Sequence, residues 1–539
     1  MGDPTPITVK KPLSRVMGAA GIIMLATLLS RVTGFLRTAL IQVVMMPKGY
    51  SDEFILAFSL PDIAFNLLAG GAIAAALIPV MSSFLSKGKE EDAWKALSTF
   101  LNISMIAMMV LEVVFFIWTD GILALVAAGY SGKGTGDRQM LVTLTRILLI
   151  NVPFMMLAGQ CNGILNSYRK FAAAAFGPVI YNICTIIGIG LFGGSNVYLV
   201  AWAIVASAAI FLLVQLAATW RHFKRYRLSL EWRHPAFRKM LKLAVPSLMS
   251  SSIVEFNNVV ARGFATFLPE GMLTLLYVAN RTWQLPMGIF AQSIGIAMLP
   301  TLSAHHAAHE TEAFRRLFNR GVRAVFLISL PISVIMMVQD QQIMRVLFKW
   351  GGSVPETDVY YSGLALLGYG SALIFASILG MTIRAFYAMH DSITPLVNGI
   401  LGIGVNFGFN ALFQHFTNFG IAGTALSYSI TSLFNMLILL FVFSRKTGIR
   451  FYSDNGLFFG KCFVAMVPAG TVLYALTLLL LPDIGSKTSQ IICMAVPAVT
   501  CCTVFYFMAL AFRIHEVSML WQMVAGKIKR FRKKPDSMT

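Results

Sequence analysis

Charged residues are scarce in this sequence, and long stretches contain none. Only 12% of its 539 residues are charged while 57% are hydrophobic, and the mean hydropathy is +0.73. Soluble domains carry about 25% charged residues. A chain with so little polar surface cannot cover a soluble core, so the composition predicts an integral membrane protein.

The alternating pattern of a transmembrane β-barrel is also missing. Barrel strands alternate apolar and polar residues over about ten positions, whereas the apolar runs here are long and unalternating. A helix satisfies its own backbone and crosses the hydrocarbon in about 20 residues. The fold class predicted is therefore an all-α polytopic membrane protein.

Catalytic and metal-binding patterns are lacking as well. There is no P-loop, and the six cysteines lie in apolar segments without metal-ligand spacing, as small hydrophobic residues do. His305, His306 and His309 have no matching carboxylates or cysteines, which favours a solvated face. We therefore expect no catalytic residue, no metal and no cofactor, and a protein that is not an enzyme.

The apolar runs predict about fourteen transmembrane helices, an even number that puts both chain ends on one side. These spans are 18–46, 53–85, 93–118, 139–165, 171–193, 196–219, 241–268, 271–304, 317–339, 358–388, 393–415, 419–444, 457–481 and 488–512.

Acidic residues are few, 23 against 43 Lys and Arg, which gives a net charge of +20. The basic residues collect in loops on one side of the predicted membrane, so the positive-inside rule makes both termini cytoplasmic. The longest basic linker, 221–242, interleaves basic residues with aromatic ones such as Tyr226 and Trp232. We interpret it as an interfacial stretch on anionic lipid and expect no nucleic-acid partner.

Two pairs of similar segments indicate an internal repeat. Segment 76–83 resembles 297–304, and 166–169 resembles 387–390, both at an offset of six helices. Such a repeat predicts two pseudo-symmetric six-helix lobes, helices 1–6 and 7–12, around a central cavity that works by rocking. The predicted domains are 1–228, 229–452, and 453–539 with two extra helices and a basic tail.

Three arginines fall at positions where a charge is expensive. Arg31 and Arg37 lie within the first span, with Gly34 between them permitting a bend, and Arg281 lies well inside the eighth. A charge at membrane depth needs a partner or an aqueous cavity. Arginine binds phosphate with its planar fork, so an anionic substrate is predicted to supply the missing negative charge.

Polar residues near these arginines complete the predicted site. Asp52 and Asp62 lie at the start of and within the second span, and Asp62 is a candidate partner for Arg31 or Arg37. Glu255 and Arg262 share a face of the seventh span about 10 Å apart. This spacing predicts partners on other helices or on the substrate instead of each other.

Several motifs together give a family resemblance over nearly the whole chain. They are Ser30–Arg37, Ser51–Asp52 through Leu60–Pro61, Gly71–Ile73 through Ile78–Pro79, Gly163–Tyr168, Ala279–Arg281, Leu299–Ser303 and Arg384–Ala388. The chain resembles the MurJ/MviN lipid II flippase family of the multidrug/oligosaccharidyl-lipid/polysaccharide exporter superfamily. That family moves the undecaprenyl-pyrophosphate-linked peptidoglycan precursor across the bacterial inner membrane by alternating access.

The resemblance implies that Arg31, Arg37 and Arg281 match the family's essential cavity arginines, and that Asp52 matches a further functional acid. It assigns the last two helices, 457–512, to a groove for the lipid tail. Phe65 stands where some members have an arginine, beside Asn66, which we include among the substrate ligands. Thr38 and Gln284 replace acidic positions of the family.

Three transport functions remain open at this point. The first is a lipid II flippase, driven by the membrane potential or an ion gradient, with cell-wall synthesis proteins as candidate partners. The second is a flippase for another undecaprenyl-linked oligosaccharide, whose pyrophosphate would meet the same arginines. The third, a cation-coupled multidrug exporter, would favour acidic residues in the cavity.

Overall fold

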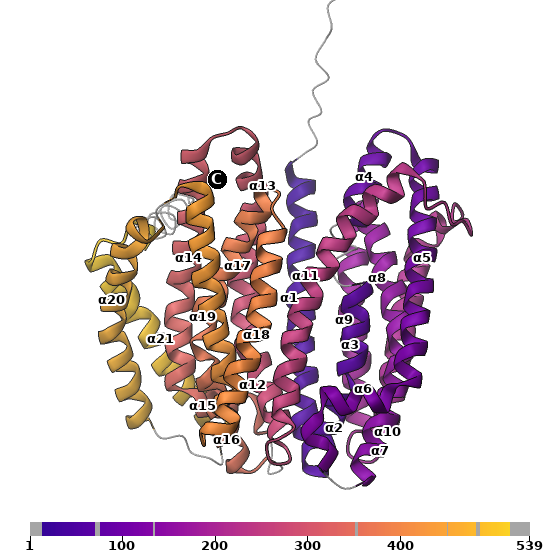
Figure 1. Cartoon of the computed structure of the whole chain (residues 1–539). Helices are drawn as coiled ribbons and strands as arrows, with labels where there is room; N and C mark the ends of the chain where they lie inside the picture. Colours follow the sequence, from indigo (N-terminus) through magenta and orange to yellow (C-terminus); the bar gives the residue numbers. More distant parts are fainter. Residues whose placement is uncertain are drawn as a thin grey trace, which may run out of the picture. The chain divides into compact units, whose positions relative to one another are not determined.

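The structure, a computed structural model, describes residues 13–69, 76–132, 135–350, 354–449, 451–480 and 486–517. These residues form helices and no strand (Figure 1). Eleven helices in this part of the chain are long and apolar enough to cross a membrane, which confirms the all-α polytopic fold. Segment 71–73 of the family motifs and the basic tail 527–534 lie outside the described residues.

Three further predicted spans are not among these eleven, which were sought in the described residues alone. They correspond to α1 (Leu13–Leu40), to the interrupted segment α2 (Ser51–Ala57), α3 (Ser59–Leu68) and α4 (Ile78–Ser86), and to α11 (Pro235–Ala265). Seven of the eight predicted site residues lie on these helices.

The chain divides into two compact units whose limits differ from the domain limits expected from the sequence. Unit 1 consists of Met1–Val44, Leu56–Ile122 and Thr135–Ser252, and unit 2 of Met45–Ile55, Leu123–Gly134 and Ile253–Thr539. Two short segments from the first half of the chain therefore belong to unit 2. The limit at Ser252–Ile253 falls inside α11, several residues after Pro246.

Unit 1 is a bundle of helices. Besides α1, α3, α4 and the first part of α11, it contains α5 (Glu90–Ile117), the start of α6 (Thr119–Val126), α7 (Thr135–Leu149), α8 (Asn151–Ser167), α9 (Phe171–Phe192) and α10 (Val197–Phe223). Of these, α1, α8, α9 and α10 make the most extensive contacts, and α9 packs between α1 and α10. A core around the fully buried Trp94 joins α4 and α5 to the start of α11.

Unit 2 contains the remaining helices. After the second part of α11 they are α12 (Met272–Pro286), α13 (Gln292–Ala307), α14 (Thr311–Val338), α15 (Asp340–Phe348), α16 (Glu356–Gly370), α17 (Ala372–Ala388), α18 (Ile393–Phe416), α19 (Gly420–Thr447), α20 (Phe451–Leu479) and α21 (Lys487–Ala511). A π-helical turn at Met287–Ala291 follows Pro286 and separates α12 from α13. The helix that carries Arg281 therefore ends shortly after it.

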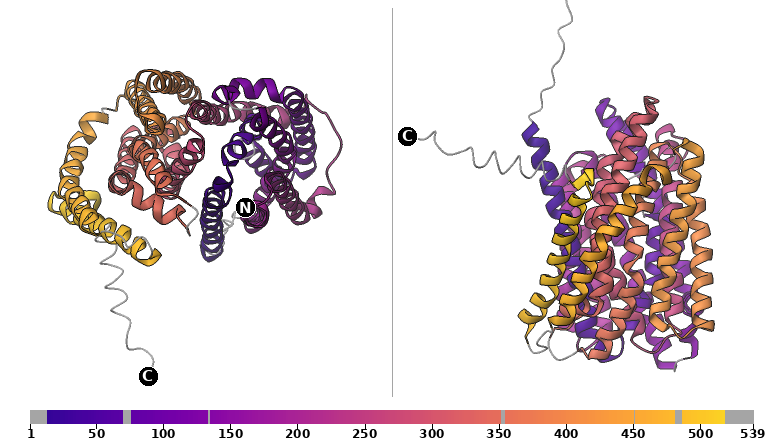
Figure 2. Two further views of the ribbon diagram at one scale, coloured as in Figure 1. Left: turned by 90° about the horizontal axis from the view of Figure 1, so that it is seen from below. Right: turned by 90° about the vertical axis from the view of Figure 1, so that its left-hand side faces the viewer.

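Helices α20 and α21 run side by side and fasten to α14 and α15 (Figure 2). Arg315 of α14 donates two hydrogen bonds to the Asp454 carboxylate of α20, at 2.5 and 2.7 Å. Arg323, two turns further along α14, donates to Asn455 and to Glu516, which follows α21. Charge-assisted hydrogen bonds thus attach the start of α20 and the segment that follows α21 to α14.

The internal repeat is visible in the geometry of four short connections. Gly88, Arg169, His309 and His390 all adopt a left-handed backbone, with φ between 56° and 72°. In each case the amide of the next residue bonds back to the carbonyl five positions earlier, the Schellman arrangement that ends a helix. The same spacing separates Gly88 from His309 and Arg169 from His390, which supports the predicted two-fold repeat.

The attachment of the C-terminal helix pair gives a stability test. Asp454→Asn removes the charge that receives both bonds from Arg315, so we expect a loss of about 1–3 kcal/mol of stability. Glu312→Gln is the matched control, because Glu312 pairs with the same arginine but its side chain is 66% exposed. Thermal unfolding in detergent should show a lower midpoint for the first variant alone, and equal midpoints would contradict the assignment.

Candidate substrate site

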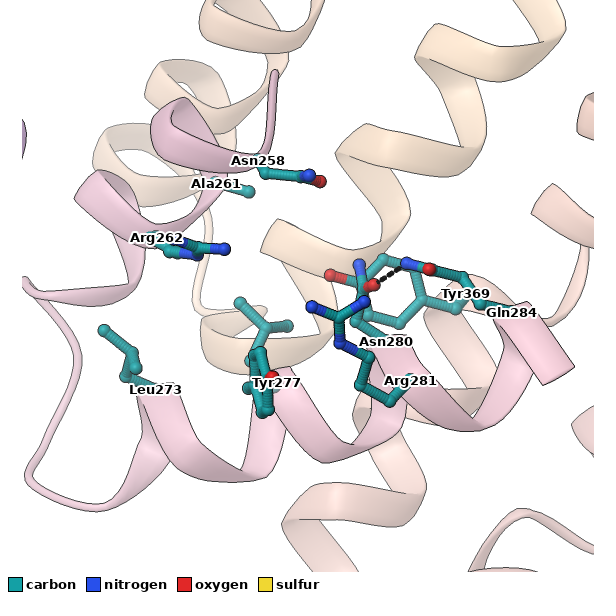
Figure 3. A pocket seen from close by; sticks show the side chains of 10 residues that line it. Asn258, Ala261, Arg262, Leu273, Tyr277, Asn280, Arg281, Gln284 and Tyr369 are labelled. Carbon is teal, nitrogen blue, oxygen red and sulfur yellow. Dashed lines mark hydrogen bonds between the residues drawn. The ribbon is translucent and has the colours of Figure 1, made fainter. Parts of the chain in front are cut away.

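A pocket in unit 2 contains two of the predicted arginines (Figure 3). Arg262 of α11 and Arg281 of α12 both project into it. The Tyr277 side chain, also from α12, lies between the two arginines. The remaining lining residues are Asn258, Ala261, Leu273, Leu276, Asn280, Gln284 and Tyr369. The open pocket has an empty volume of about 450 Å³, and most of its polar groups are cations or amides.

Arg281 is oriented by an aromatic neighbour on its own helix. Its guanidinium carbon lies 5.0 Å from the centre of the Tyr277 ring, one turn earlier on α12. A cation–π contact fixes the direction of the charge without neutralising it. Beside it, Gln284 donates a hydrogen bond to the Asn280 side-chain oxygen (Figure 3), so α12 presents charge and amide groups on one face.

Arg262 forms an ion pair with Glu255, and the expectation that the two are too distant to pair was wrong. Arg262 Nη2 lies 3.5 Å from Glu255 Oε1, and both residues are less than 10% exposed. Asn258 donates a hydrogen bond to the other carboxylate oxygen at 3.3 Å. Side chains on a helix lean toward its N-terminus, so a long arginine reaches back across two turns toward the glutamate.

Asp52 lies at the N-terminus of the helix that carries Arg281. Its carboxylate accepts hydrogen bonds from the backbone amides of Gly271 and Thr274, at 2.8 and 2.9 Å, and from the Thr274 hydroxyl at 2.6 Å. A carboxylate here satisfies amides that have no partner within the helix and complements the positive end of the helix dipole. Asp52 therefore positions α12 and is not among the residues that line the pocket.

Arg31 and Arg37 are half-buried on α1 in unit 1. Helix α1 continues through Gly34 without a break and packs against α9. Asn182 of α9 donates to the Ser30 carbonyl at 3.1 Å. The guanidinium carbon of Arg37 lies 5.8 Å from the centre of the Tyr181 ring. Adjacent residues of α9 thus set the position of α1 and the direction of Arg37.

Asp62 and Asn66 lie one turn apart on α3 in unit 1. The Asn66 side chain donates to the Asp62 carbonyl at 2.9 Å, and the Ser251 hydroxyl donates to the Asn66 carbonyl at 3.2 Å. The side chain of Asn66 is therefore engaged by its own helix. A pairing of Asp62 with Arg31 or Arg37 stays a prediction.

The residues that the sequence analysis missed are aromatic. Tyr181, Tyr277 and Tyr369 flank the arginines or line the pocket. Only Tyr277 had a usable signal, since it precedes Arg281 by one helical turn. The described residues also contain no group of three or more His, Cys, Asp and Glu placed to hold a metal. His305 does have a carboxylate neighbour, Glu310, at 2.6 Å.

The sequence profile of the family described as "Lipid II flippase MurJ" matches residues 44–490. The chain belongs to the MurJ family. Among curated members of the MurJ family, the lipid II flippase MurJ of Burkholderia cenocepacia is 30% identical over 84% of this chain and 87% of its own length. A probable lipid II flippase MurJ of Vibrio cholerae is 26% identical over 80% of this chain and 83% of its own length.

Solved structures agree with this assignment at the level of the fold. A structure described as lipid II flippase MurJ in an inward closed conformation matches 90% of this chain and 99% of its own, with a TM-score of 0.71 and 21% identity. An inward-facing multidrug resistance transporter of the MATE family matches 78% of this chain and 94% of its own, with a TM-score of 0.63 and 17% identity.

The three departures from the MurJ pattern occupy local environments that suit uncharged residues. Phe65 packs against an apolar cluster that includes Ala64, Met108 and Val152. Thr38 is 2% exposed and donates to the Gly34 carbonyl of its own helix. Gln284 bonds to Asn280 within the pocket. The replacements are therefore accommodated by packing or by neighbouring hydrogen-bond acceptors.

The role of Asp52 as a cap on another helix can be tested by an isosteric change. In Asp52→Asn one side-chain oxygen becomes a donor that faces the amides of Gly271 and Thr274, so we expect a loss of about 1–2 kcal/mol and weaker transport. Thermal unfolding and complementation of a flippase-depleted strain measure the two effects. Glu91→Gln is the control, because Glu91 is an exposed carboxylate in the first turn of α5. An equally small change in both variants would refute the role.

Proposed function

We propose that this protein moves lipid II from the cytoplasmic to the outer leaflet of a bacterial inner membrane by alternating access. The proposal rests on membership of the MurJ family and on one observation of this structure. That observation is the convergence of Arg262 of α11 and Arg281 of α12 on a single pocket.

The chemistry of this pocket suits a pyrophosphate. Two guanidinium groups can each offer a pair of parallel N–H donors to phosphate oxygens, and both stay protonated. Glu255 pairs with Arg262, and its 3.5 Å separation from Arg262 is longer than the 2.7–2.9 Å typical of a charge-assisted hydrogen bond. Arg262 can therefore exchange part of its carboxylate contact for a substrate oxygen.

Arg31 and Arg37 remain proposed substrate ligands, together with Asp62, Asn66 and Glu255, while Asp52 contributes indirectly. The contact between Arg37 and Tyr181 supports this proposal for Arg37, since the ring directs the charge and leaves its N–H donors available to an anion. Asp52 acts through α12 instead of by contact. Its hydrogen bonds fix the start of the helix on which Arg281 lies seven positions later.

We propose that the membrane potential drives the net outward movement. Each negative charge carried outward across an inside-negative membrane gains about 2.3 kcal/mol per 100 mV, and a pyrophosphate carries more than one such charge. The protein then needs no covalent chemistry of its own. The basic loops support cytoplasmic termini, and enzymes that make and use the lipid-linked precursor are proposed as partners.

Two other functions share the fold. A flippase for another undecaprenyl-linked oligosaccharide would use the same arginines, because the pyrophosphate is common to both substrates. A multidrug exporter is supported by the fold similarity to a MATE transporter. It is opposed by a pocket whose charged lining residues are both arginines, which repels cationic drugs.

The central prediction concerns Arg281. Arg281→Gln removes the charge and its paired donors while keeping a polar side chain, so we expect roughly a tenfold to hundredfold loss of substrate affinity and failure to complement a strain depleted of its flippase. Arg281→Lys should rescue only partly, because an ammonium cannot bind bidentately. Exposure of lipid II on the outer leaflet of spheroplasts is the direct measurement.

Arg138→Gln is the control for this series, since Arg138 forms an ion pair with Asp120 whose side chain is 60% exposed. Arg262→Gln removes the cation that pairs with the buried Glu255 carboxylate. The double variant Arg262→Gln, Glu255→Gln also removes that carboxylate charge, and it therefore separates loss of binding from loss of folding. Full lipid II exposure in Arg281→Gln would overturn the site. Rescue of O-antigen export without rescue of peptidoglycan synthesis would show that the substrate is another undecaprenyl-linked oligosaccharide and not lipid II.

The driving force gives a separate prediction. Valinomycin with external potassium collapses the membrane potential, and we expect lipid II exposure to fall in cells that depend on this protein. Nigericin, which collapses the pH gradient alone, should leave exposure unchanged. The opposite pattern, inhibition by nigericin only, would show that a proton gradient and not the membrane potential drives transport.

A further inference from the structure

The linker between α10 and α11, residues 224–234, lies outside the substrate site and follows an unusual path within unit 1. It begins after Phe223 and ends before Pro235, and only brief turns interrupt its extended course. We call this segment the strap. In Figure 1 it is the loop beyond the outer side of α5.

The strap is tied to α5 by its backbone. Ser98 and Thr99 accept hydrogen bonds from the amides of Arg227 and Glu231, at 3.1 and 3.2 Å. Asn102 donates to the Ser229 carbonyl at 2.9 Å. All three α5 side chains are buried beneath the strap, so its course is fixed by polar groups of a membrane-spanning helix.

These contacts make the strap dip along α5 and return. Near its start, Arg225 pairs with Glu90, the first residue of α5, at 3.3 Å. Ser229 reaches Asn102, which lies about 18 Å along the helix axis from Glu90. Glu231 then bonds to Thr99, closer to the helix start. Asn102 also lies seven positions beyond Lys95, the last charged residue before the apolar part of α5, so the lowest point reaches the edge of the hydrocarbon.

The side chains at this lowest point are apolar and exposed. Leu228 is 89% exposed, Leu230 is 56% exposed and Trp232 is 61% exposed. The backbone bonds hold the intervening residues against α5, so these three side chains point away from the helix. A soluble environment would make such exposure unfavourable, whereas a lipid interface is where tryptophan and leucine side chains are stabilised.

Basic residues flank the apolar ones. Arg221, Lys224, Arg225, Arg227 and Arg233 are exposed, while Glu231 is the one acidic residue of the strap. The guanidinium of Arg233 stacks 5.0 Å from the centre of the Trp232 ring. Each basic residue near an anionic surface contributes about 1 kcal/mol of attraction. The exposed apolar side chains of the strap suit the hydrocarbon of an anionic leaflet, and the basic side chains beside them suit its headgroups.

We propose that the strap is a binding site for anionic phospholipids, with Leu228, Leu230 and Trp232 inserted at the level of the upper acyl chains and the arginines on lipid phosphates. This function is separate from substrate transport and goes beyond the interfacial reading of the sequence. It assigns the lipid class, the inserted residues and the α5 side chains that hold them at depth.

The test uses the full-length protein in nanodiscs of phosphatidylcholine, with or without phosphatidylglycerol. Phosphatidylglycerol should raise the thermal unfolding midpoint of the wild type. The triple variant Lys224→Gln, Arg227→Gln, Arg233→Gln should lose most of that rise, while its midpoint in phosphatidylcholine alone stays at the wild-type value. The matched control Lys87→Gln, Arg316→Gln, Arg320→Gln removes three exposed basic residues outside the strap and should keep the rise.

Depth is measured separately from charge. The part of the tryptophan fluorescence that Trp232→Phe removes should be quenched by lipids brominated in the upper acyl chain and protected from aqueous iodide. Quenching by iodide alone, which would indicate a strap open to water or a protein partner, overturns the proposal. Equal loss of the phosphatidylglycerol effect in both triple variants, or no effect in the wild type, overturns it as well.

Discussion

The constraint on which the structure depends is the cost of a charge at membrane depth. Each ionisable side chain there needs compensation, and the protein supplies it in three different ways. Arg262 has a carboxylate, Glu255, two turns away on the same helix. Arg37 and Arg281 lie beside tyrosine rings, which attract a cation without cancelling it. Asp52 has backbone amides of another helix. Each of these charges therefore has its own local compensation.

The predicted site residues are concentrated on a few helices. Seven of the eight predicted site residues lie on α1, α2, α3 and α11. Helix α12 ends in a π-helical turn at Pro286, close to Arg281. Irregular backbone of this kind must be stabilised by protein contacts and not by lipid.

Much of the architecture could be predicted from the sequence, because hydropathy and repeat spacing report directly on membrane helices. The repeat of 76–83 in 297–304 led to two related halves, and the left-handed turns at Gly88 and His309 support it. The arginines of the pocket were also found, since a charge in an apolar run is conspicuous. The pairing of Glu255 with Arg262 was missed because axial distance ignores side-chain reach. Tyr181 and Tyr369 were missed because an aromatic residue in an apolar helix has no distinguishing neighbour in sequence.

The shared left-handed turns have a mechanical consequence for any rearrangement of the molecule. A turn closed by a bond from the residue after the left-handed position to the carbonyl five residues earlier contains no spare chain length. Two helices joined in this way cannot slide past one another without breaking that bond. Large displacements must then occur in longer connections or inside helices such as α11, which contains a proline. Each tightly joined pair of helices moves as one rigid body.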